Sequence, residues 1–322
     1  MHAIRISRVG GPEVLEWVEV PDPQPGEGDL LVRLDAVGVN FVDVYHRTGL
    51  YPDELPFVPG QEGVGTVVDV GRGVSGFNVG DRVASSDASG SYAEKAIIKA
   101  GRAVRVPSSI DAPVAAASMV QGMTAHYLAH DTFPLQAGQL CLIHAGAGGV
   151  GHLLIQIAKR IGATVFTTVG SAAKADIARR AGADHVLLRD EGDFGDRVEE
   201  LVGSHALDVV YDGVGRSTFD RGLELLRPRG MMVAFGNASG PVDPVDPLRL
   251  SRAGSLYLTR PSLGHYVRER EELDRRAGDI FEWISKGELD VLVGARFPLS
   301  DAADAHRALE GRETIGKVVL LP

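Results

Sequence analysis

The stretch that decides the fold is Ala145-Gly146-Ala147-Gly148-Gly149-Val150-Gly151. Gly146, Gly148 and Gly151 satisfy the pattern G-x-G-x-x-G. In a dinucleotide site the first glycine permits a tight turn, the second lets the backbone approach a pyrophosphate, and the third lets a helix pack close to a strand. Here an apolar run precedes the glycines and an amphipathic helical pattern follows them, as the motif requires. The stretch therefore predicts a dinucleotide site with the pyrophosphate at the positive end of a helix.

Strand and helix patterns alternate around this turn. Apolar residues recur at helical spacing over residues 150–161, which predicts a helix there. Short apolar runs that predict buried strands lie at 140–145, 164–169, 185–188, 207–211 and 231–235. Segments of helical character lie between most of these runs. This alternation predicts βαβ units and a parallel sheet.

Residues 1–122 follow another pattern, with short strands separated by glycine and proline. Residues 30–34 and 65–70 are predicted strands of a mostly antiparallel, β-rich module. A predicted helix around residues 267–286 and a strand at 317–321 complete the chain. At about 150 residues per domain, the 322 residues favour two domains.

The composition excludes several classes of protein. Hydrophobic residues make up 44% of the chain and charged residues 24%, as in a packed globular protein. The net charge of −10 disfavours a nucleic-acid partner. The single cysteine, Cys141, excludes an intramolecular disulfide and a four-cysteine zinc site. No run of 18 apolar residues and no signal-peptide pattern occurs, so we expect a cytoplasmic protein without a membrane span.

The residues at the end of the predicted strand 164–169 indicate which dinucleotide binds. An NAD site usually has an acidic residue about 20 positions beyond the first glycine, where it binds the ribose hydroxyls. Here residues 165–171 are apolar, hydroxylic or glycine, and no carboxylate precedes Asp176. Lys174 supplies a cation for a 2′-phosphate, although a solvated helix residue is the alternative for an isolated lysine. NADPH is the expected cofactor.

Further motifs resemble a known family. They are Gly38-Val39-Asn40-Phe41-Val42-Asp43, Pro59-Gly60-Gln61-Glu62-Gly63-Val64-Gly65, Val79-Gly80-Asp81-Arg82-Val83, Tyr211-Asp212-Gly213-Val214-Gly215, Phe235-Gly236-Asn237, Gly254-Ser255-Leu256 and Tyr257-Leu258-Thr259-Arg260-Pro261-Ser262. In this order they resemble the medium-chain dehydrogenase/reductase superfamily. Within it, the chain is most similar to the quinone oxidoreductase group that includes zeta-crystallin.

The resemblance implies an α/β protein with two domains. A GroES-like, β-rich catalytic domain would comprise residues 1–122 and 265–322. A Rossmann domain with a doubly wound parallel sheet would comprise residues 123–264. The resemblance places the active site in the cleft between these domains and implies a homodimer.

The same resemblance implies that the enzyme works without zinc. Zinc-dependent members have a ligand cysteine where this chain has Asn40 and a ligand histidine where it has Gln61. Amide side chains do not replace a thiolate or an imidazole as strong zinc ligands. His126 and His130 are spaced as neighbours on a helix, but no glutamate lies between them and no third ligand is evident. We expect them to be an ordinary pair on a helix surface.

The resemblance also implies which residues contact the cofactor and the acceptor. The expected catalytic positions are Asn40, Tyr45, Tyr51 and Gln61. Asn40 and Gln61 are candidate hydrogen-bond donors to a developing oxyanion, and Tyr45 and Tyr51 are candidate aromatic walls or proton donors. The expected cofactor positions are Asn40, Tyr45, Tyr127, Gly146, Gly148, Gly149, Val150, Gly151, Gly170, Ser171, Lys174, Arg189, Phe235, Gly236, Ala238 and Arg312. Arg189 departs from the family pattern, because some relatives have a tyrosine there. An arginine binds phosphate through two hydrogen bonds, so the change is compatible with NADPH.

These expectations favour hydride transfer from NADPH to a small, flat electron acceptor such as a quinone. A quinone is already electrophilic, so it needs positioning more than a Lewis acid. One alternative is reduction of an activated carbon–carbon double bond in an enone or enoyl thioester. Another is a crystallin-like or RNA-binding protein that holds NADPH without turnover.

Overall fold

The computed structural model describes residues 1–322 and divides into two compact units. One unit consists of Met1–Met123 together with Val267–Pro322, and is called the terminal unit here. The other consists of Thr124–Tyr266 and is called the central unit. None of the helices is both long enough and apolar enough to cross a membrane.

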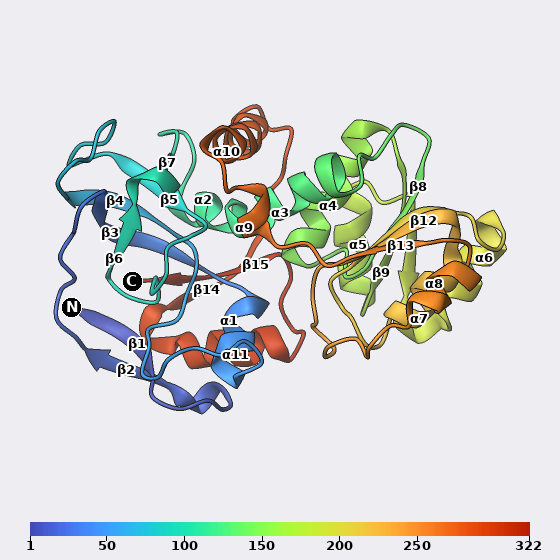
Figure 1. The fold of residues 1–322 in the computed structure, drawn as a ribbon, viewed down its shortest axis with the longest axis horizontal. Coiled ribbons are helices and arrows are strands. Elements are labelled where there is room, and N and C mark those ends of the chain that lie inside the picture. The colour runs from blue at the N-terminus through green and yellow to red at the C-terminus, as the bar shows by residue number, and fades with distance from the viewer. The chain divides into compact units, whose positions relative to one another are not determined.

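The central unit is built on a parallel sheet of six strands (Figure 1). The strands are β8 (Leu140–Ile143), β9 (Thr164–Val169), β10 (His185–Leu188), β11 (Leu207–Asp212), β12 (Leu226–Ala234) and β13 (Tyr257–Thr259). They are hydrogen-bonded in the order β10-β9-β8-β11-β12-β13. Counted from β8, this is the order 3-2-1-4-5-6 of the Rossmann fold. The prediction of a doubly wound parallel sheet is confirmed.

Helices precede, connect and follow these strands. They are α3 (Val120–Tyr127), the π-helical η3 (Leu128–Thr132), α4 (Gly149–Ile161), α5 (Ala172–Arg180), α6 (Phe194–Val202), α7 (Phe219–Leu225), α8 (Pro247–Arg252) and α9 (Leu263–Tyr266). Helix α4 contacts α5, and α6 contacts α7. Val198 of α6 and Leu223 of α7 share a buried cluster with Leu142, Phe166 and Val210 of the sheet. The apolar stripe expected over residues 150–161 is the buried side of α4.

Strand β12 begins earlier than its apolar run predicts. The sequence predicts a strand at 231–235, whereas β12 starts at Leu226. Its pairing with β11 shifts register, because Leu207 pairs with Leu226 and Val209 pairs with Met231. The extra residues form a bulge that includes Arg229 at a φ of 63°. A bulge of this kind interrupts the apolar pattern, which explains the difference.

The terminal unit is β-rich and mostly antiparallel (Figure 1). Its strands are β1 (His2–Ile6), β2 (Leu15–Glu19), β3 (Asp29–Val39), β4 (Gly63–Val70), β5 (Arg82–Ser85), β6 (Lys95–Lys99), β7 (Val104–Arg105), β14 (Val293–Pro298) and β15 (Lys317–Leu321). Seven of them form one sheet in the order β14-β15-β3-β4-β5-β7, with β6 also paired to β3, while β1 pairs with β2. Only the β14–β15 pair in this unit is parallel.

Four α-helices accompany these strands. They are α1 (Phe41–Thr48), α2 (Ala112–Ser118), α10 (Arg270–Ser285) and α11 (Ala302–Glu310). Short 3₁₀ segments occur in both units: η1 (Pro12–Val14), η2 (Ala100–Arg102), η4 (Arg189–Glu191) and η5 (Leu299–Asp301). Ile4, Val32, Ile98 and Val318 belong to one buried apolar cluster that joins strands from both ends of the chain.

A chain of buried polar side chains links α11 to α1. Arg47 donates to Nδ1 of His306 at 3.0 Å and binds both carboxylate oxygens of Glu310 at 2.8 Å. The Tyr92 hydroxyl lies 3.0 Å from Nε2 of His306 and donates to Oδ2 of Asp43 at 3.1 Å. Because a guanidinium can only donate, Nδ1 of His306 acts as the acceptor and Nε2 carries the proton. Both ring nitrogens of His306 therefore have partners when His306 is neutral.

The environment of this network shifts two pKa values in opposite directions. Burial, followed by the nearby charge of Arg47, lowers the pKa of His306 from 6.5 to about 3. Burial raises the pKa of Asp43 to about 7, despite the hydrogen bond from the Asn40 backbone N–H. Between pH 6.5 and 3 the unfolded chain therefore binds a proton at His306 that the folded chain does not. His306 makes the folded state less stable as the pH falls through this window, whereas Asp43 acts in the opposite sense below pH 7.

Replacing His306 with glutamine tests this linkage. The Gln amide keeps one acceptor for Arg47 and one donor for Tyr92 but does not titrate. Between pH 6 and 4, the free energy of unfolding of His306→Gln should fall less steeply than that of the wild type, by up to about 1.4 kcal/mol per pH unit. Urea denaturation across this range measures both slopes. Parallel slopes would show that His306 is not held neutral by the fold.

Candidate functional site

The carboxyl ends of β8 and β11 meet at the point where the strand order reverses. These two strands are neighbours in the sheet, but the connections from them run to opposite sides. In open parallel sheets, ligands bind outside the carboxyl ends of the strands at such a point. The glycine turn that follows β8 lies there.

Two glycines of the turn are required by the packing of the chain, and a third is not. A Cβ on Gly146 would lie 2.1 Å from the hydroxyl oxygen of Thr167, and one on Gly151 would lie 2.4 Å from the carbonyl oxygen of Ala145. A Cβ on Gly148 would meet only that same carbonyl oxygen, at 3.2 Å. Its φ of −81° and ψ of 168° are accessible to any residue. The open space at Gly148 is therefore available to a ligand.

Gly148 also lies directly before the first residue of helix α4. Gly148 is the N-cap residue, no side chain caps the helix, and the first turn has no acidic residue. The first N–H groups of a helix lack intrahelical partners and form its positive end. An anionic pyrophosphate fits this arrangement beside Gly148, Gly149 and Val150.

A buried carboxylate organises the loop after β11. Asp212 is fully buried and accepts hydrogen bonds from the N–H groups of Val214 at 2.7 Å and Gly215 at 2.9 Å. Both of its oxygens also accept from the Thr218 hydroxyl, at 3.0 and 2.9 Å. The loop beside the reversal point is therefore held by the chain itself.

Three predicted cofactor residues follow the next strand, β12, against this loop. A Cβ on Gly213 would lie 2.8 Å from the ring of Phe235, and a Cβ on Gly236 would lie 2.4 Å from the Gly213 carbonyl oxygen. The N–H of Ala238 donates to that oxygen at 3.3 Å. The structure thus brings Phe235, Gly236 and Ala238 to the same edge of the sheet as the glycine turn.

The predicted 2′-phosphate residues lie at the ends of the neighbouring strands β9 and β10. Ser171 is the N-cap of α5, and its hydroxyl accepts from the Lys174 N–H at 3.4 Å. Arg189 follows β10, and one terminal nitrogen of its guanidinium lies 3.9 Å from the position that a Cβ on Gly170 would take. Ser171, Lys174 and Arg189 therefore follow the carboxyl ends of two neighbouring strands, in the region where a 2′-phosphate is expected.

Two other predicted cofactor residues lie elsewhere. Tyr127 is 2% exposed, and its ring stacks on Tyr266 with the centroids 4.1 Å apart. Arg312 belongs to the terminal unit, where it is exposed in the turn between α11 and β15. A cofactor contact by either residue stays a prediction.

In the terminal unit, Asn40 belongs to a buried polar cluster. Its amide nitrogen donates to Glu62 at 2.7 Å, and its amide oxygen accepts from Lys317 at 2.7 Å. Lys317 also forms an ion pair with Glu62, and both side chains are at most 1% exposed. A Cβ on Gly38 would overlap the Glu62 carboxylate, so the glycine leaves the space that this pair occupies. The cluster uses the amide oxygen of Asn40 and one of its two amide hydrogens.

Gln61 contacts a second polar group rather than the Asn40 cluster. Its amide nitrogen lies 3.0 Å from Nε2 of His46, and Nδ1 of His46 lies 2.5 Å from Oδ2 of Asp53. The Tyr51 ring stands edge-on to both His46 and Tyr45, with centroids 5.7 and 5.3 Å away. The predicted residues Tyr45, Tyr51 and Gln61 are thus brought together around a histidine that the sequence did not indicate.

The prediction that His126 and His130 form a surface pair is wrong. His126 is 1% exposed and its ring centroid lies 4.5 Å from that of His130. The neighbouring Met123, Ala125 and Leu128 are buried too, so this segment exposes no regular polar face. No group of three or more His, Cys, Asp or Glu side chains is arranged to hold a metal ion.

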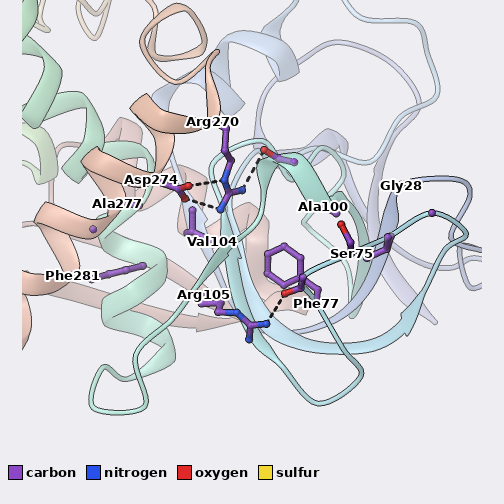
Figure 2. Close-up of a pocket in the computed structure, with 15 residues that line it drawn as sticks. Gly28, Ser75, Phe77, Ala100, Val104, Arg105, Arg270, Asp274, Ala277 and Phe281 are labelled. Atoms are coloured by element: carbon purple, nitrogen blue, oxygen red, sulfur yellow. Dashed lines mark hydrogen bonds and ion pairs between the residues drawn. The ribbon is translucent and has the colours of Figure 1, made fainter.

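A pocket of about 670 Å³ lies within the terminal unit, between α10 and the loop around Phe77 (Figure 2). Arg270 in its wall is bound to Asp274 and to the Ala103 carbonyl oxygen. Arg105 is bound to the Gly76 carbonyl oxygen and packs over the Phe77 ring. None of the predicted site residues lines this pocket. Arg270 and Arg105 are thus both bound to other groups of the terminal unit.

The sequence missed several residues of these sites. Glu62 and Asp212 lie within the recognised motifs, but nothing in the sequence assigned them a partner. The long-range pairing of Glu62 with Lys317 appears only when β15 is placed beside β3. His46 and Asp53 are seven residues apart across a turn and follow no periodic pattern.

Known proteins resemble the chain over both units. Residues 26–108 match the family model of the alcohol dehydrogenase GroES-like domain, and residues 149–276 match that of the zinc-binding dehydrogenases. The chain is 43% identical to quinone oxidoreductase 1 of Escherichia coli K12, in an alignment that covers 99% of each chain. It is 42% identical to a 2-haloacrylate reductase of a Burkholderia species, in an alignment that covers 98% of each chain.

Solved structures agree with these matches. The E. coli quinone oxidoreductase in complex with NADPH superimposes with a TM-score of 0.98 at 42% identity, covering 100% of both chains. A mycobacterial protein, also solved in complex with NADPH, superimposes with a TM-score of 0.97 at 50% identity over 100% of both chains.

The glycine turn generates a direct prediction. Gly148→Val should fold, since an added Cβ has only one atom within 4 Å, the Ala145 carbonyl oxygen at 3.2 Å, but it should lose NADPH binding because the side chain fills the expected pyrophosphate space. Circular dichroism, thermal melting and NADPH fluorescence titration test this together.

Gly151→Val provides the contrast. Its side chain would collide with the backbone of the turn, so this variant should lose stability as well. A folded Gly148→Val protein with wild-type affinity for NADPH would show that the turn is only structural.

Proposed function

The chain belongs to the quinone oxidoreductase group of the medium-chain dehydrogenase/reductase superfamily, and we propose that it transfers hydride from NADPH to a quinone without zinc. The observation that carries the proposal is the open, uncapped glycine turn at the reversal point of the Rossmann sheet. The relatives that are solved with NADPH bound support the choice of cofactor.

The residues of the central unit fit NADPH. Gly148, Gly149 and Val150 would bind the pyrophosphate through backbone N–H groups. Ser171, Lys174 and Arg189, with Gly170 leaving space beside them, would bind the 2′-phosphate, and Phe235, Gly236 and Ala238 would lie on the nicotinamide side. When bound, NADPH supplies the hydride. The remaining tasks of the chain are to orient the acceptor, exclude water and provide a proton.

The donor set at the zinc-ligand positions favours an acceptor that needs no Lewis acid. Asn40 is engaged with Glu62 and Lys317, and Gln61 with His46. Neither amide is a strong zinc ligand. A quinone carbonyl accepts hydride without a metal, and an amide hydrogen stabilises the oxyanion that develops. The remaining amide hydrogen of Asn40 and the amide of Gln61 are the donors we propose, with Tyr45 and Tyr51 as aromatic walls.

Reduction of an activated carbon–carbon double bond is the second candidate. One relative at 42% identity is named for 2-haloacrylate, a compound with such a bond. Hydride addition to the bond also needs a positioned acceptor and an anion-stabilising donor rather than zinc. The acceptor assay below distinguishes the two functions.

We also propose that the protein is a cytoplasmic homodimer, as the family resemblance implies. Its mass in solution, measured by light scattering after gel filtration, tests the dimer. A monomer at micromolar concentration would contradict it.

The phosphate residues predict a preference for NADPH over NADH. Lys174→Met and Arg189→Met should each weaken NADPH binding by about 1.5–3 kcal/mol through loss of a charge-assisted hydrogen bond, and should leave NADH binding nearly unchanged. Fluorescence titration with both cofactors measures the effect. Arg180→Met, an exposed arginine at the far end of the same helix, is the matched control. Equal dissociation constants of the wild type for the two cofactors would refute the assignment.

Turnover with different acceptors tests the function itself. With a chelator present, NADPH oxidation should be fast with 1,4-naphthoquinone or phenanthrenequinone and much slower with an enoyl thioester.

Active protein should contain well under one zinc per chain by metal analysis. The reverse order of rates would favour the double-bond reductase, and activity that chelation removes and zinc restores would refute a zinc-free mechanism.

A further inference from the structure

We propose that His46, oriented by Asp53 and Gln61, is the proton donor that completes reduction of the acceptor. This inference rests on the proposed function and adds to it a residue for the proton step. It assigns His46 as the catalytic acid and Asp53 as a positioning residue, and it adds a contact with the imidazole to the proposed role of Gln61 as an oxyanion donor.

The pairing with Asp53 fixes how the imidazole is oriented. Nδ1 of His46 lies 2.5 Å from Oδ2 of Asp53, and the two side chains are 22% and 34% exposed. A carboxylate in this position accepts the Nδ1 proton and stabilises the imidazolium. The second nitrogen, Nε2, is then the one that exchanges a proton with the site. A carboxylate at one ring nitrogen thus orients His46 so that the other nitrogen can act as a general acid.

Gln61 can satisfy Nε2 in both charge states. Its amide nitrogen lies 3.0 Å from Nε2, which fits a neutral imidazole that accepts from the amide. If the amide turns by half a rotation, its oxygen faces Nε2 and accepts from the imidazolium. Each charge state of His46 thus has a hydrogen-bond partner at Nε2.

The position of Gln61 connects this group to the acceptor. Gln61 is one of the donors that the proposed function assigns to the acceptor, and its amide contacts Nε2 of His46. The rings of Tyr51 and Tyr45 border the same region, and Tyr51 is edge-on to the imidazole. Two titratable groups contact His46, Asp53 and Tyr51, and both come from the loop after α1.

The proton balance requires such a donor. Hydride and its two electrons convert the quinone to a hydroquinone monoanion and leave NADP⁺. The monoanion takes the proton from Nε2 of the His46 imidazolium, forming an O–H bond as the N–H bond breaks. Neutral His46 remains hydrogen-bonded to Asp53 and regains a proton from bulk water. No further oxidant or reductant is needed.

Chemical rescue tests the proton step. In full-length protein, His46→Ala should lower kcat with 1,4-naphthoquinone on the order of 10²-fold. NADPH affinity should be unchanged, and added imidazole should restore kcat because it occupies the vacated space and supplies the acid. His2→Ala is the matched control, because His2 is also paired with a carboxylate, Glu94, and should keep wild-type kcat.

A second measurement needs no turnover. In ¹⁵N-histidine NMR spectra of the wild type, neutral His46 should carry its proton on Nδ1, and Asp53→Asn should reduce the population of that tautomer. A proton on Nε2 instead, wild-type kcat in His46→Ala, or a loss of kcat that imidazole does not restore would each overturn the proposal. If His46→Ala does not fold, His46→Gln is used, with the loss of kcat and of the wild-type solvent isotope effect expected.

The failure of this proposal is distinguishable from failure of the proposed function. A wild-type protein that does not oxidise NADPH with the quinone refutes both. Normal wild-type turnover together with an unaffected His46→Ala refutes the proton donor alone.

Discussion

The close approach of α4 to the sheet is the constraint on which the central unit depends. Side chains at Gly146 or Gly151 would collide with Thr167 or with the backbone of the turn. Because these two glycines remove the collision, only residues 144–148 separate β8 from the helix, and the helix N-terminus lies at the edge where the strand order reverses. Gly148, which packing does not require, leaves this positive edge open. A fold requirement and a binding site are thus built from adjacent residues of one motif.

The terminal unit depends on a different interaction, a buried ion pair between Glu62 and Lys317. Glu62 and Lys317 come from distant parts of the chain and are almost completely buried, so each needs the other. Removing one partner of such a pair commonly destabilises a protein by about 3–5 kcal/mol, because the remaining charge is unpaired. Asn40 is fixed on this pair through both ends of its amide. The amide of Asn40 is therefore held in one orientation by the fold of its own unit.

Local patterns predicted the parts of the molecule that are made by neighbouring residues. The strands at 164–169, 185–188 and 317–321 coincide with β9, β10 and β15, because each is a short apolar run bounded by turn residues. The bulge in β12 and the burial of His126 were not predictable in this way, since both depend on what packs against them.

The residues of the candidate site also fall into those that a sequence motif predicts and those that it does not. The glycine turn and the residues after β9 carry a sequence signature, and the structure gathers them at one edge. The contacts between Asp53, His46 and Gln61 have no sequence signature, because they join helix α1 to two separate loop segments, one after α1 and one before β4. The roles of Tyr127 and Arg312 remain predictions from the resemblance.

A single-turnover experiment tests the central claim, hydride transfer from NADPH to a quinone, most directly. The protein, preloaded with one equivalent of NADPH and a chelator, is mixed anaerobically with 1,4-naphthoquinone in a stopped-flow spectrometer. The account predicts one quinol formed for each NADPH oxidised, with a rate that slows when the transferred hydrogen of NADPH is deuterium. NADPH that persists in the presence of the quinone, or oxidation without this isotope dependence and without stoichiometric quinol, would contradict it.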